Sequence, residues 1–395
     1  MRVLALMMKS LLRMGLLPRV LIAICLGIVL ATIMPMWLVR VFMTFNGIFS
    51  ELLKFLIPLI IVGLVMPAIG EIGRKARLLL FMTVVIAYVD TVFCGLLAYA
   101  TGSLCFPDMV ASVVGVTQGI TSQPEPIPPY FTISIPPILG VMTALIFSFI
   151  TGIYIASSEL PTLLSISREF RTVVSMAISQ MIIPLLPLYI FGIFLQMTIS
   201  GQTWHILNIF GQVIVVIFVL HILILLGQFC IAGIVAGKNP LRLLYNMLPA
   251  YMTALGTSSS AATIPVTLRL TLKNGVSDDV AGFCVPLCAT IHMSGSSMKI
   301  TACALTICLL EGLPTDFSLF LNFVMMLGIV MVAAPGVPGG AIMAALAPLS
   351  SILGFTAEQQ ALMIALYISM DSFGTACNVT GDGAIAIIID RLKNR

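Results

Sequence analysis

Charged residues are scarce in this chain. Asp, Glu, Lys and Arg make up 9% of its 395 residues, whereas hydrophobic residues make up 60%. Soluble domains carry about a quarter charged residues, so the composition excludes an ordinary soluble protein. Apolar runs of about 20 residues recur, which predicts helices that cross a bilayer rather than the alternating strands of an outer-membrane barrel. We therefore predict an all-α membrane protein that is surrounded by lipid and binds no nucleic acid.

Groupings of metal-binding or catalytic residues are also missing. The nine Cys show no paired spacing, and the three His are too dispersed to complete a zinc site with Cys284 and Cys288. The catalytic alternative is an intramembrane serine hydrolase that uses Ser259, His292 and Asp371, but the sequence contains no G-x-S-x-G elbow. We expect the protein not to be an enzyme.

The placement of the cations predicts the topology. Sixteen of the 19 Lys and Arg residues lie before the first apolar run, in alternate gaps between runs, or at the C-terminus. Cytoplasmic loops carry an excess of Lys and Arg, so both termini are predicted to be cytoplasmic. The segment 103–135 carries Asp108 and Glu125 but no Lys or Arg, and we place it outside. These features predict a multi-pass protein of a bacterial inner membrane.

The first six predicted spans are uniformly apolar. They cover residues 19–39, 47–70, 78–102, 136–157, 172–199 and 205–236. The Pro-rich segment 118–136, QGITSQPEPIPPYFTISIP, is predicted to be an external loop.

The pattern changes after Lys238. MLPAYMTALGTSSSAATIPVTLRLTLK is apolar at both ends, and cations flank it on both sides. Because a span cannot start and finish on the same side, we predict a re-entrant helical hairpin with a Ser-rich tip. A span over 280–310 follows and is interrupted by HMSGSSMK. A second hairpin over 318–354, interrupted by AAPGVPGGA, enters from outside, and the last span contains DSFGTACNVTGDGAIAIIID.

Segments 240–311 and 315–391 thus share one plan in opposite orientations, a hairpin followed by a broken helix. The predicted fold has eight transmembrane helices plus two re-entrant helical hairpins, arranged as inverted repeats. Interrupted segments in corresponding positions point to the binding site of a transporter. The reason is that non-helical backbone inside a membrane persists only where it is buried or lines a cavity.

Four polar residues of the last span are expected on one helix face. Asp371, Thr375, Asn378 and Asp382 step by four, three and four residues, and at about 100° per residue the fourth returns to within roughly 20° of the first. A carboxylate deep in a bilayer is unfavourable by several kcal/mol unless it is paired or binds an ion. The stripe therefore predicts a visiting cation, and the alternative is a polar seam that holds helices together.

Three motifs carry a resemblance to a known family. TSSSAATIPV, GVPGGAIM and D-x-x-G-T-x-x-N-V-T-G-D resemble the dicarboxylate/amino acid:cation symporters, which have the glutamate-transporter fold. The resemblance is strongest over 240–391. It implies a homotrimeric secondary transporter in which spans 1, 2, 4 and 5 of region 1–236 form a scaffold. Spans 3 and 6 would move with the transport core, 237–395, in an elevator-type mechanism.

The resemblance also implies site residues. Asp371 would pair with the α-ammonium of the substrate, Thr375 and Asn378 would address its α-carboxylate, and Asp382 would bind Na⁺. The implied substrate contacts are Ser258, Ser259, Ser260, Ser296, Gly336, Val337, Gly339, Asp371, Gly374, Thr375 and Asn378. The implied sodium ligands, side chain or backbone, are Cys288, Thr290, His292, Met331, Ala334, Asn378 and Asp382. The alternative interpretation of the Ser run is that small residues are needed only to form a tight hairpin tip.

Two departures from the family pattern bear on the substrate. Members that carry acidic substrates have an Arg where this chain has Gly374, so its absence favours a neutral substrate such as serine, threonine or alanine. The family's Asn-Met-Asp-Gly-Thr stretch reads His-Met-Ser-Gly-Ser over 292–296, which removes a carboxamide and a carboxylate from one sodium site. The small-residue form of that stretch and the GVPGGA tip, which is one residue shorter, resemble the serine/threonine:sodium branch.

Lys299 is a third departure and leaves alternatives open. It could form an ion pair with Asp90 that replaces the lost sodium site, enter the space vacated at Gly374 and restore acidic specificity, or find another partner. His292 could couple protons or only pack through hydrogen bonds. The sequence therefore predicts a Na⁺-coupled carrier of a small neutral amino acid, with an acidic amino acid or dicarboxylate, coupled to Na⁺ or H⁺, as the alternative. A passive channel is the remaining rival.

Overall fold

The computed structural model describes residues 16–70, 77–114, 127–158, 160–201, 203–332, 334 and 339–393. Within these ranges the regular structure is helical, without strands. The helices of the first part are α2 (Leu16–Leu30), α3 (Met36–Gly70), α4 (Arg77–Val114), α5 (Val141–Ser158), α6 (Pro161–Ala177), the π-helical turn η2 (Ile178–Ile182), α7 (Ile183–Ile199) and α8 (Thr203–Ala236). Those of the second part are α9 (Pro240–Thr257), α10 (Ser260–Lys273), α11 (Asp278–Ile291), α12 (Ser294–Glu311), α13 (Phe317–Met331), α14 (Gly340–Ser351), α15 (Ala357–Ser369) and α16 (Asp371–Lys393).

Six of the described helical segments are long and apolar enough to cross a bilayer. They are Met36–Pro67, Leu79–Ala111, Pro161–Ile199, Leu207–Ala236, Asp278–Glu311 and Asp371–Lys393. The predicted first and fourth spans correspond to shorter apolar helices, Pro18–Leu30 and Ile146–Ser158. The chain is therefore a multi-pass membrane protein.

Several predicted boundaries were wrong. The spans predicted at 19–39 and 47–70 divide at residues 31–35 instead, and α3 is a single 35-residue helix. Arg168 and Arg171, predicted to lie between spans, belong to α6, which runs through η2 into α7. Hydropathy marks the part of a helix that faces lipid, whereas helices extend past it into the polar zone. The predicted external loop is irregular over 127–140, and residues 115–126 lie outside the described residues.

The second part contains two helix–tip–helix units and two interrupted helices. Helix α9 packs against α10, and α13 packs against α14, each as an antiparallel pair. Ser258, with φ of 50°, turns the first tip, and Gly339, with φ of 75°, ends the second tip. The α11–α12 helix is interrupted at His292 and Met293, and the α15–α16 helix at Met370. Each repeat therefore has an interrupted pair followed by an interrupted helix, as the sequence predicted.

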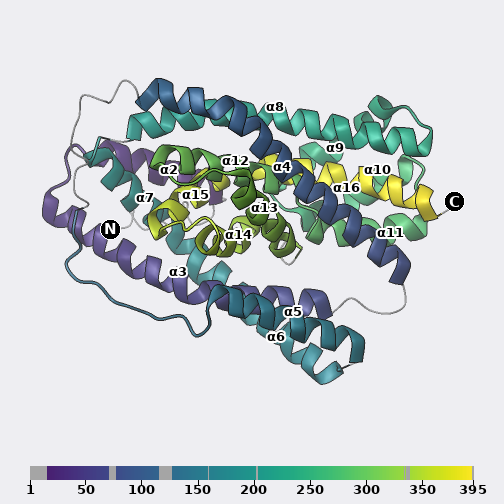
Figure 1. Cartoon of the computed structure of the whole chain (residues 1–395), viewed down its shortest axis with the longest axis horizontal. Coiled ribbons are helices and arrows are strands. Elements are labelled where there is room, and N and C mark those ends of the chain that lie inside the picture. Colours follow the sequence, from purple (N-terminus) through teal and green to yellow (C-terminus); the bar gives the residue numbers. More distant parts are fainter. Residues whose placement is uncertain are drawn as a thin grey trace, which may run out of the picture.

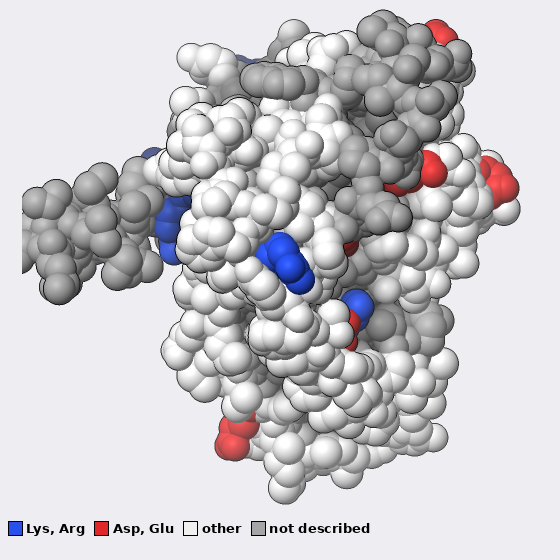
Figure 2. All heavy atoms as spheres, turned by 90° about the vertical axis from the view of Figure 1, so that its left-hand side faces the viewer, with Lys and Arg blue, Asp and Glu red and all other residues white. Residues whose placement is uncertain are grey.

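The interrupted helices form the centre of the molecule. Nearly every residue of α12 and of α16 is buried. Helix α4 packs along α12, while α8, α9, α10 and α11 surround α16. Helices α3, α5 and α6 pack together at the opposite edge from α8 (Figure 1). Figure 2 looks at the left-hand end of this helix bundle, where a few Lys, Arg, Asp and Glu side chains stand among uncharged residues.

Charged residues from three segments meet at one end of the molecule. The Lys238 ammonium donates to the carbonyl of Asn274 at 2.6 Å, and Lys393 pairs with Asp279. The predicted topology puts all of these segments on the cytoplasmic side, and their proximity agrees with a shared side.

Close helix packing in the first part depends on small residues. A Cβ added at Gly27 of α2 would lie 2.9 Å from the carbonyl oxygen of Phe191 and 3.1 Å from the Cβ of Phe194, both in α7. Small residues at such contacts let membrane helices approach each other closely. The nearest obstruction is backbone, which cannot rotate away.

We expect Gly27→Ala to destabilise the protein by about 1–3 kcal/mol, the usual effect of overpacking. The matched control is Gly227→Ala in α8, where an added Cβ meets nothing within 4 Å. That substitution should be neutral or slightly stabilising, since Ala favours helix over Gly by about 1 kcal/mol. Thermal unfolding in detergent compares the two, and equal midpoints would contradict the proposed close contact.

Candidate functional site

The polar stripe of α16 is buried along its whole length. Asp371, Thr375, Asn378 and Asp382 are 7%, 7%, 4% and 1% exposed. The sequence produces this arrangement because the 3.6-residue period places all four on one side. That side faces the two tips and the interruption between α11 and α12, and its partners differ from one end to the other.

At the N-terminal end, the Asp371 carboxylate joins the second tip to α12, and the neighbouring Ser372 contacts the first tip. Its Oδ2 accepts from the backbone N–H of Gly339 at 2.7 Å, and its Oδ1 lies 3.7 Å from the Lys299 ammonium. The neighbouring Ser372 hydroxyl lies 2.6 Å from that of Ser258 at the first tip. Asp371 is thus held between a backbone donor and a cation.

Lys299 is fully buried beside Asp371 and Gly374. Its ammonium donates to the carbonyl of Met370 at 3.1 Å and lies 3.6 Å from the centre of the Tyr367 ring. A Cβ at Gly374 would come within 2.6 Å of the Lys299 Nζ. The ammonium therefore occupies the space that a side chain at position 374 would fill.

Of the alternatives left open for Lys299, the ion pair with Asp90 is not found. In one continuous helix, His292 and Lys299, seven residues apart, would lie on nearly one face. His292 precedes the start of α12 at Ser294, so the helical period does not connect the two. Asp90 instead accepts from His292, and Lys299 faces Asp371.

Asn378 binds the first turn of α12. Its Oδ1 accepts from the backbone N–H groups of Gly295 and Ser296 at 2.8 and 3.3 Å, and its Nδ2 donates to the Ser296 hydroxyl at 3.0 Å. That hydroxyl is also 3.0 Å from the hydroxyl of Tyr367. A side chain thus satisfies N–H groups that the interruption leaves free.

The N-terminal ends of α10, α12, α14 and α16 meet around the first two turns of α16. The contacts Ser258–Ser372, Asn378–Gly295 and Asp371–Gly339 join them. Helix N-termini carry partial positive charge and free N–H groups, which favour a bound carboxylate. Asp371 supplies the opposite charge, so the site can receive an ammonium and a carboxylate side by side.

At the other end of the stripe, the His292 imidazole lies between two carboxylates. Its Nδ1 is 2.8 Å from Oδ1 of Asp382, and its Nε2 is 2.7 Å from Oδ2 of Asp90 in α4. Gln228 of α8 donates to the same Asp90 oxygen at 2.7 Å and to the Ser294 hydroxyl at 3.2 Å. The other oxygen of Asp382 is buried and has no hydrogen-bond partner among the described residues.

Sodium ligation was predicted here, and the residues fit it in part. The buried, unpartnered oxygen of Asp382 is the type of ligand that a hard cation takes. The Oδ1 of Asn378, in contrast, is occupied by two N–H groups. Asp382 therefore fits a bound Na⁺, whereas the Asn378 side chain fits one only after it releases α12.

The remaining predicted residues surround these two ends. Cys288 is buried and its carbonyl accepts from the N–H of His292 at 2.9 Å, while the exposed Thr290 directs its hydroxyl to Leu287. Met331 and Ala334 are buried at the second tip. At the first tip, the Ser259 hydroxyl accepts from the N–H of Ala262 and caps α10, which begins at Ser260. The Thr375 hydroxyl donates to the Asp371 carbonyl. Gly336 and Val337 lie outside the described residues.

Three residues with prominent contacts were missed. Tyr367 and Ser372 adjoin the Asp371 end, and Gln228 adjoins the His292 end. A lone carboxamide in the apolar run LILLGQFC was a usable signal, because polar groups inside spans tend to be functional. Nothing in the local sequence distinguishes Tyr367 from an ordinary apolar helix residue.

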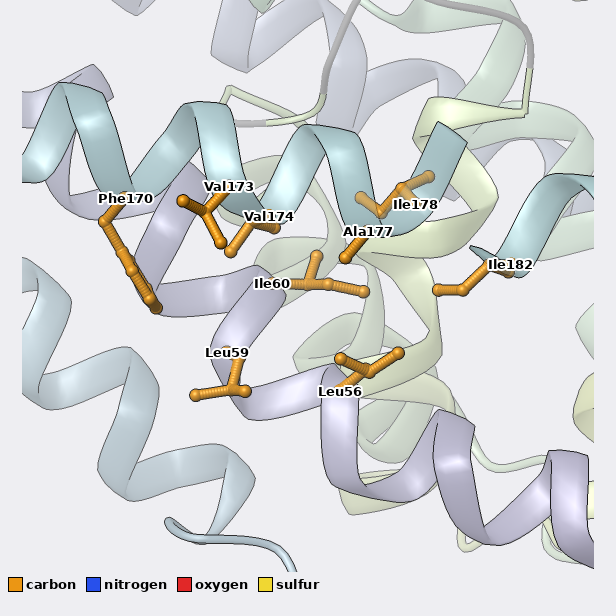
Figure 3. Close-up of a pocket in the computed structure, with 9 residues that line it drawn as sticks. All are labelled: Leu56, Leu59, Ile60, Phe170, Val173, Val174, Ala177, Ile178 and Ile182. Atoms are coloured by element: carbon orange, nitrogen blue, oxygen red, sulfur yellow. The ribbon is translucent and has the colours of Figure 1, made fainter. Parts of the chain in front are cut away.

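An apolar pocket lies away from this site, between α3 and α6–η2 (Figure 3). Its lining is Leu56, Leu59, Ile60, Phe170, Val173, Val174, Ala177, Ile178 and Ile182. The residues that line this pocket offer no polar side chain for a zwitterion or an ion, so the polar stripe remains the candidate site.

A buried ligand site built from interrupted membrane helices defines the class, a multi-pass membrane transporter. The sodium:dicarboxylate symporter family matches residues 16–392, and the chain belongs to that family, whose members are symporters and not enzymes. It is 26% identical to the serine/threonine transporter SstT of Acinetobacter baylyi over 98% of this chain and 99% of that protein.

Matches to other relatives are partial. The chain is 29% identical to excitatory amino acid transporter 3 of Mus musculus over 65% of this chain, which spans half of that protein. It is 31% identical to neutral amino acid transporter B(0) of Rattus norvegicus over 40% of this chain and 29% of that protein. Family membership supports a symporter of amino acids or dicarboxylates with Na⁺ as the general coupling ion.

We expect Lys299→Met to lower the free energy of unfolding by about 3–5 kcal/mol, because it leaves the Asp371 carboxylate buried without its cation. The double variant Lys299→Met/Asp371→Asn should regain most of that loss. The control is Lys393→Met, which breaks the exposed pair with Asp279 and should change little. Denaturation of each purified protein tests this, and a double variant no better than Lys299→Met would contradict the pairing.

Proposed function

We propose that the protein takes up a small neutral amino acid such as serine, threonine or alanine together with Na⁺. The observation that carries this proposal is the meeting of four helix N-termini beside Asp371. An α-amino acid is a zwitterion, so its ammonium can replace the Gly339 N–H at the carboxylate. Its own carboxylate can bind N–H groups at the starts of α10 and α14, and those of Gly295 and Ser296 at the start of α12 once Asn378 releases them.

The proposed preference for a neutral substrate depends on the partners of Lys299, the buried cation at the Asp371 end of the stripe. Lys299 already has Asp371, the Met370 carbonyl and the face of Tyr367 as partners. A second substrate carboxylate would have to draw the ammonium away from all three or remain unpaired at a considerable desolvation penalty. The relative named a serine/threonine transporter, which aligns along the full length, is in keeping with this proposal.

The contact between Asp371 and Gly339 suggests how binding is linked to gating. The Gly339 N–H of the second tip donates to the same Asp371 carboxylate that the substrate amine requires. A bound amine therefore competes with this hydrogen bond, and release of the amine allows the bond to form again. We propose that α9/α10 and α13/α14 are re-entrant hairpins and that they move with region 237–395 and spans 3 and 6. This unit would slide as an elevator against the rest of region 1–236.

The proposal extends to assembly and location. The protein would be a homotrimer built on spans 1, 2, 4 and 5, in the inner membrane of a bacterium, with both termini in the cytoplasm. Contacts among Lys238, Asn274, Asp279 and Lys393 support a shared side for these segments, and the positive-inside rule places that side in the cytoplasm.

An acidic amino acid or a dicarboxylate is the second candidate substrate. The observation that favours it is the position of the Lys299 ammonium in the space beside Gly374. Lys299 would then bind the side-chain carboxylate in place of the missing Arg. Lys is a point charge and lacks the fork with which Arg binds a carboxylate, so this role requires the ammonium to leave Asp371.

Uptake by the purified protein in liposomes separates the two candidates. We expect counterflow of labelled serine to be inhibited by threonine and alanine and to require Na⁺, with aspartate, glutamate and succinate ineffective. Inhibition by the acidic compounds alone would contradict the neutral substrate. Concentrative uptake that collapses with the Na⁺ gradient excludes a passive channel, whereas downhill flux alone would support one.

Asp371→Ala should abolish binding of every α-amino substrate, because the ammonium loses its carboxylate. Binding is measured as the rise in melting temperature with substrate in the presence of Na⁺. Thr253→Val in α9, a side chain that bonds only within its own helix in the described structure, serves as the control and should keep the rise. Retained serine binding by Asp371→Ala would refute the role of this carboxylate.

A further inference from the structure

The cluster around His292 contains two carboxylates where the altered motif 292–296 led us to expect a loss. Ser294 stands where the family's motif has a carboxylate, but Asp90 of α4 supplies one to the same place. Gln228 shows that the two positions adjoin, because its Nε2 reaches both Asp90 and the Ser294 hydroxyl. The carboxylate is therefore not absent but comes from another helix.

The hydrogen bonds fix the charge of the imidazole. Ionised carboxylate oxygens only accept, and each ring nitrogen of His292 lies within 2.8 Å of one. Both nitrogens must therefore donate, which makes the ring an imidazolium. The ring and the Asp382 carboxylate are buried, whereas the Asp90 side chain is 20% exposed, so the bond to Asp382 is the one shielded from water. Gly381 of α16 makes room for it, since a Cβ there would lie 2.9 Å from the His292 Cε1.

The charges of the cluster do not cancel. Asp90 and Asp382 contribute two negative charges and His292 one positive charge, which leaves one negative charge. The groups that face the ring from other elements, Gln228 and Ser294, are neutral. The unbalanced charge has a location, because Oδ2 of Asp382 is buried without a hydrogen-bond partner in the described part of the chain.

We propose that His292, held by Asp90, is a built-in cation that takes the place of one coupling Na⁺, so that this end of the site binds a single Na⁺ at Oδ2 of Asp382. This rests on the proposed function only in taking Na⁺ as the coupling ion. Asp90 is a positioning residue that acts through the imidazolium. The protein then binds fewer Na⁺ ions than a relative whose cluster lacks the imidazole.

Substitutions in the cluster should change the number of bound Na⁺ ions by whole steps. His292→Asn leaves two negative charges and should bind one more Na⁺ than the unmodified protein. Asp90→Asn leaves no net charge and should bind one fewer, or bind it at least tenfold more weakly. The double variant Asp90→Asn/His292→Asn restores one negative charge and should return to the original number.

Equilibrium binding of radioactive sodium to the purified full-length protein, without substrate and at constant ionic strength, counts these ions. The slope of the melting temperature against the logarithm of Na⁺ concentration gives an independent comparison, because each bound ion stabilises the folded state by mass action. A merely structural role would lower the melting temperature without changing either number.

The matched control is His221→Asn. His221 is a second buried histidine, on α8, whose ring nitrogens have no hydrogen-bond partner among the described residues. It should leave the number of ions unchanged. A folded His292→Asn variant that binds the original number would overturn the proposal, as would Asp90→Asn with unaltered Na⁺ affinity. If His292→Asn does not fold, the double variant decides, and the proposal falls if that protein binds one ion fewer than the unmodified chain.

Because no substrate is present, these outcomes are independent of the substrate. Failure of serine uptake with the expected ion numbers would refute the proposed substrate and support the built-in cation. Normal serine uptake with unchanged ion numbers would do the reverse.

Discussion

The two carboxylates buried on α16 require positively charged partners, and the rest of the structure is arranged to supply them. Asp371 and Asp382 lie eleven residues apart on α16 in surroundings that are otherwise apolar. An ion in a medium of low dielectric constant is unfavourable by several kcal/mol even after relaxation. Each carboxylate is accordingly matched by a cation from the interrupted α11–α12 helix, Lys299 for Asp371 and His292 for Asp382. The position of α12 against α16 is thereby fixed by charge as well as by packing.

The interruptions make this matching possible. A continuous helix through 278–311 would place His292 and Lys299 on nearly the same face, about two turns apart. The break at His292 and Met293 changes the phase of the helix between them. It also frees N–H groups at the start of α12, which Asn378 binds. The same break thus separates the Asp371 end of the stripe from the Asp382 end and supplies donors between them.

Much of the fold and of the candidate site could be predicted from the sequence, and the features that were not predicted have identifiable physical causes. The hairpin tips and breaks were visible because Ser, Gly and Pro interrupt apolar runs, and the stripe was visible from its spacing. The boundary between α2 and α3 was not, since residues 31–35, ATIMP, are as apolar as the helices around them. The partner of Lys299 stayed open among three alternatives, because the break at His292 and Met293 hides from the sequence which way α12 turns that side chain. Long-range partners such as Gln228 and Tyr367 have no local signature, because their roles arise only when distant helices pack.

Glycine decides which solution to the charge problem is available. At position 374 the missing side chain admits the Lys299 ammonium, and at 381 it admits the His292 ring. A long side chain at 374 and the observed position of Lys299 exclude each other, since a Cβ alone would come within 2.6 Å of the Nζ. A cation for Asp371 can therefore come from α16 itself or from α12, but not from both. The Arg that the resemblance gives to acidic-substrate members and Lys299 of this chain would place a cation in the same space. An Arg offers a fork of donors for a carboxylate, whereas the Lys299 ammonium is a point charge that already contacts Asp371. We expect the exchange of one for the other to keep a cation in the site while changing which carboxylates that cation can bind.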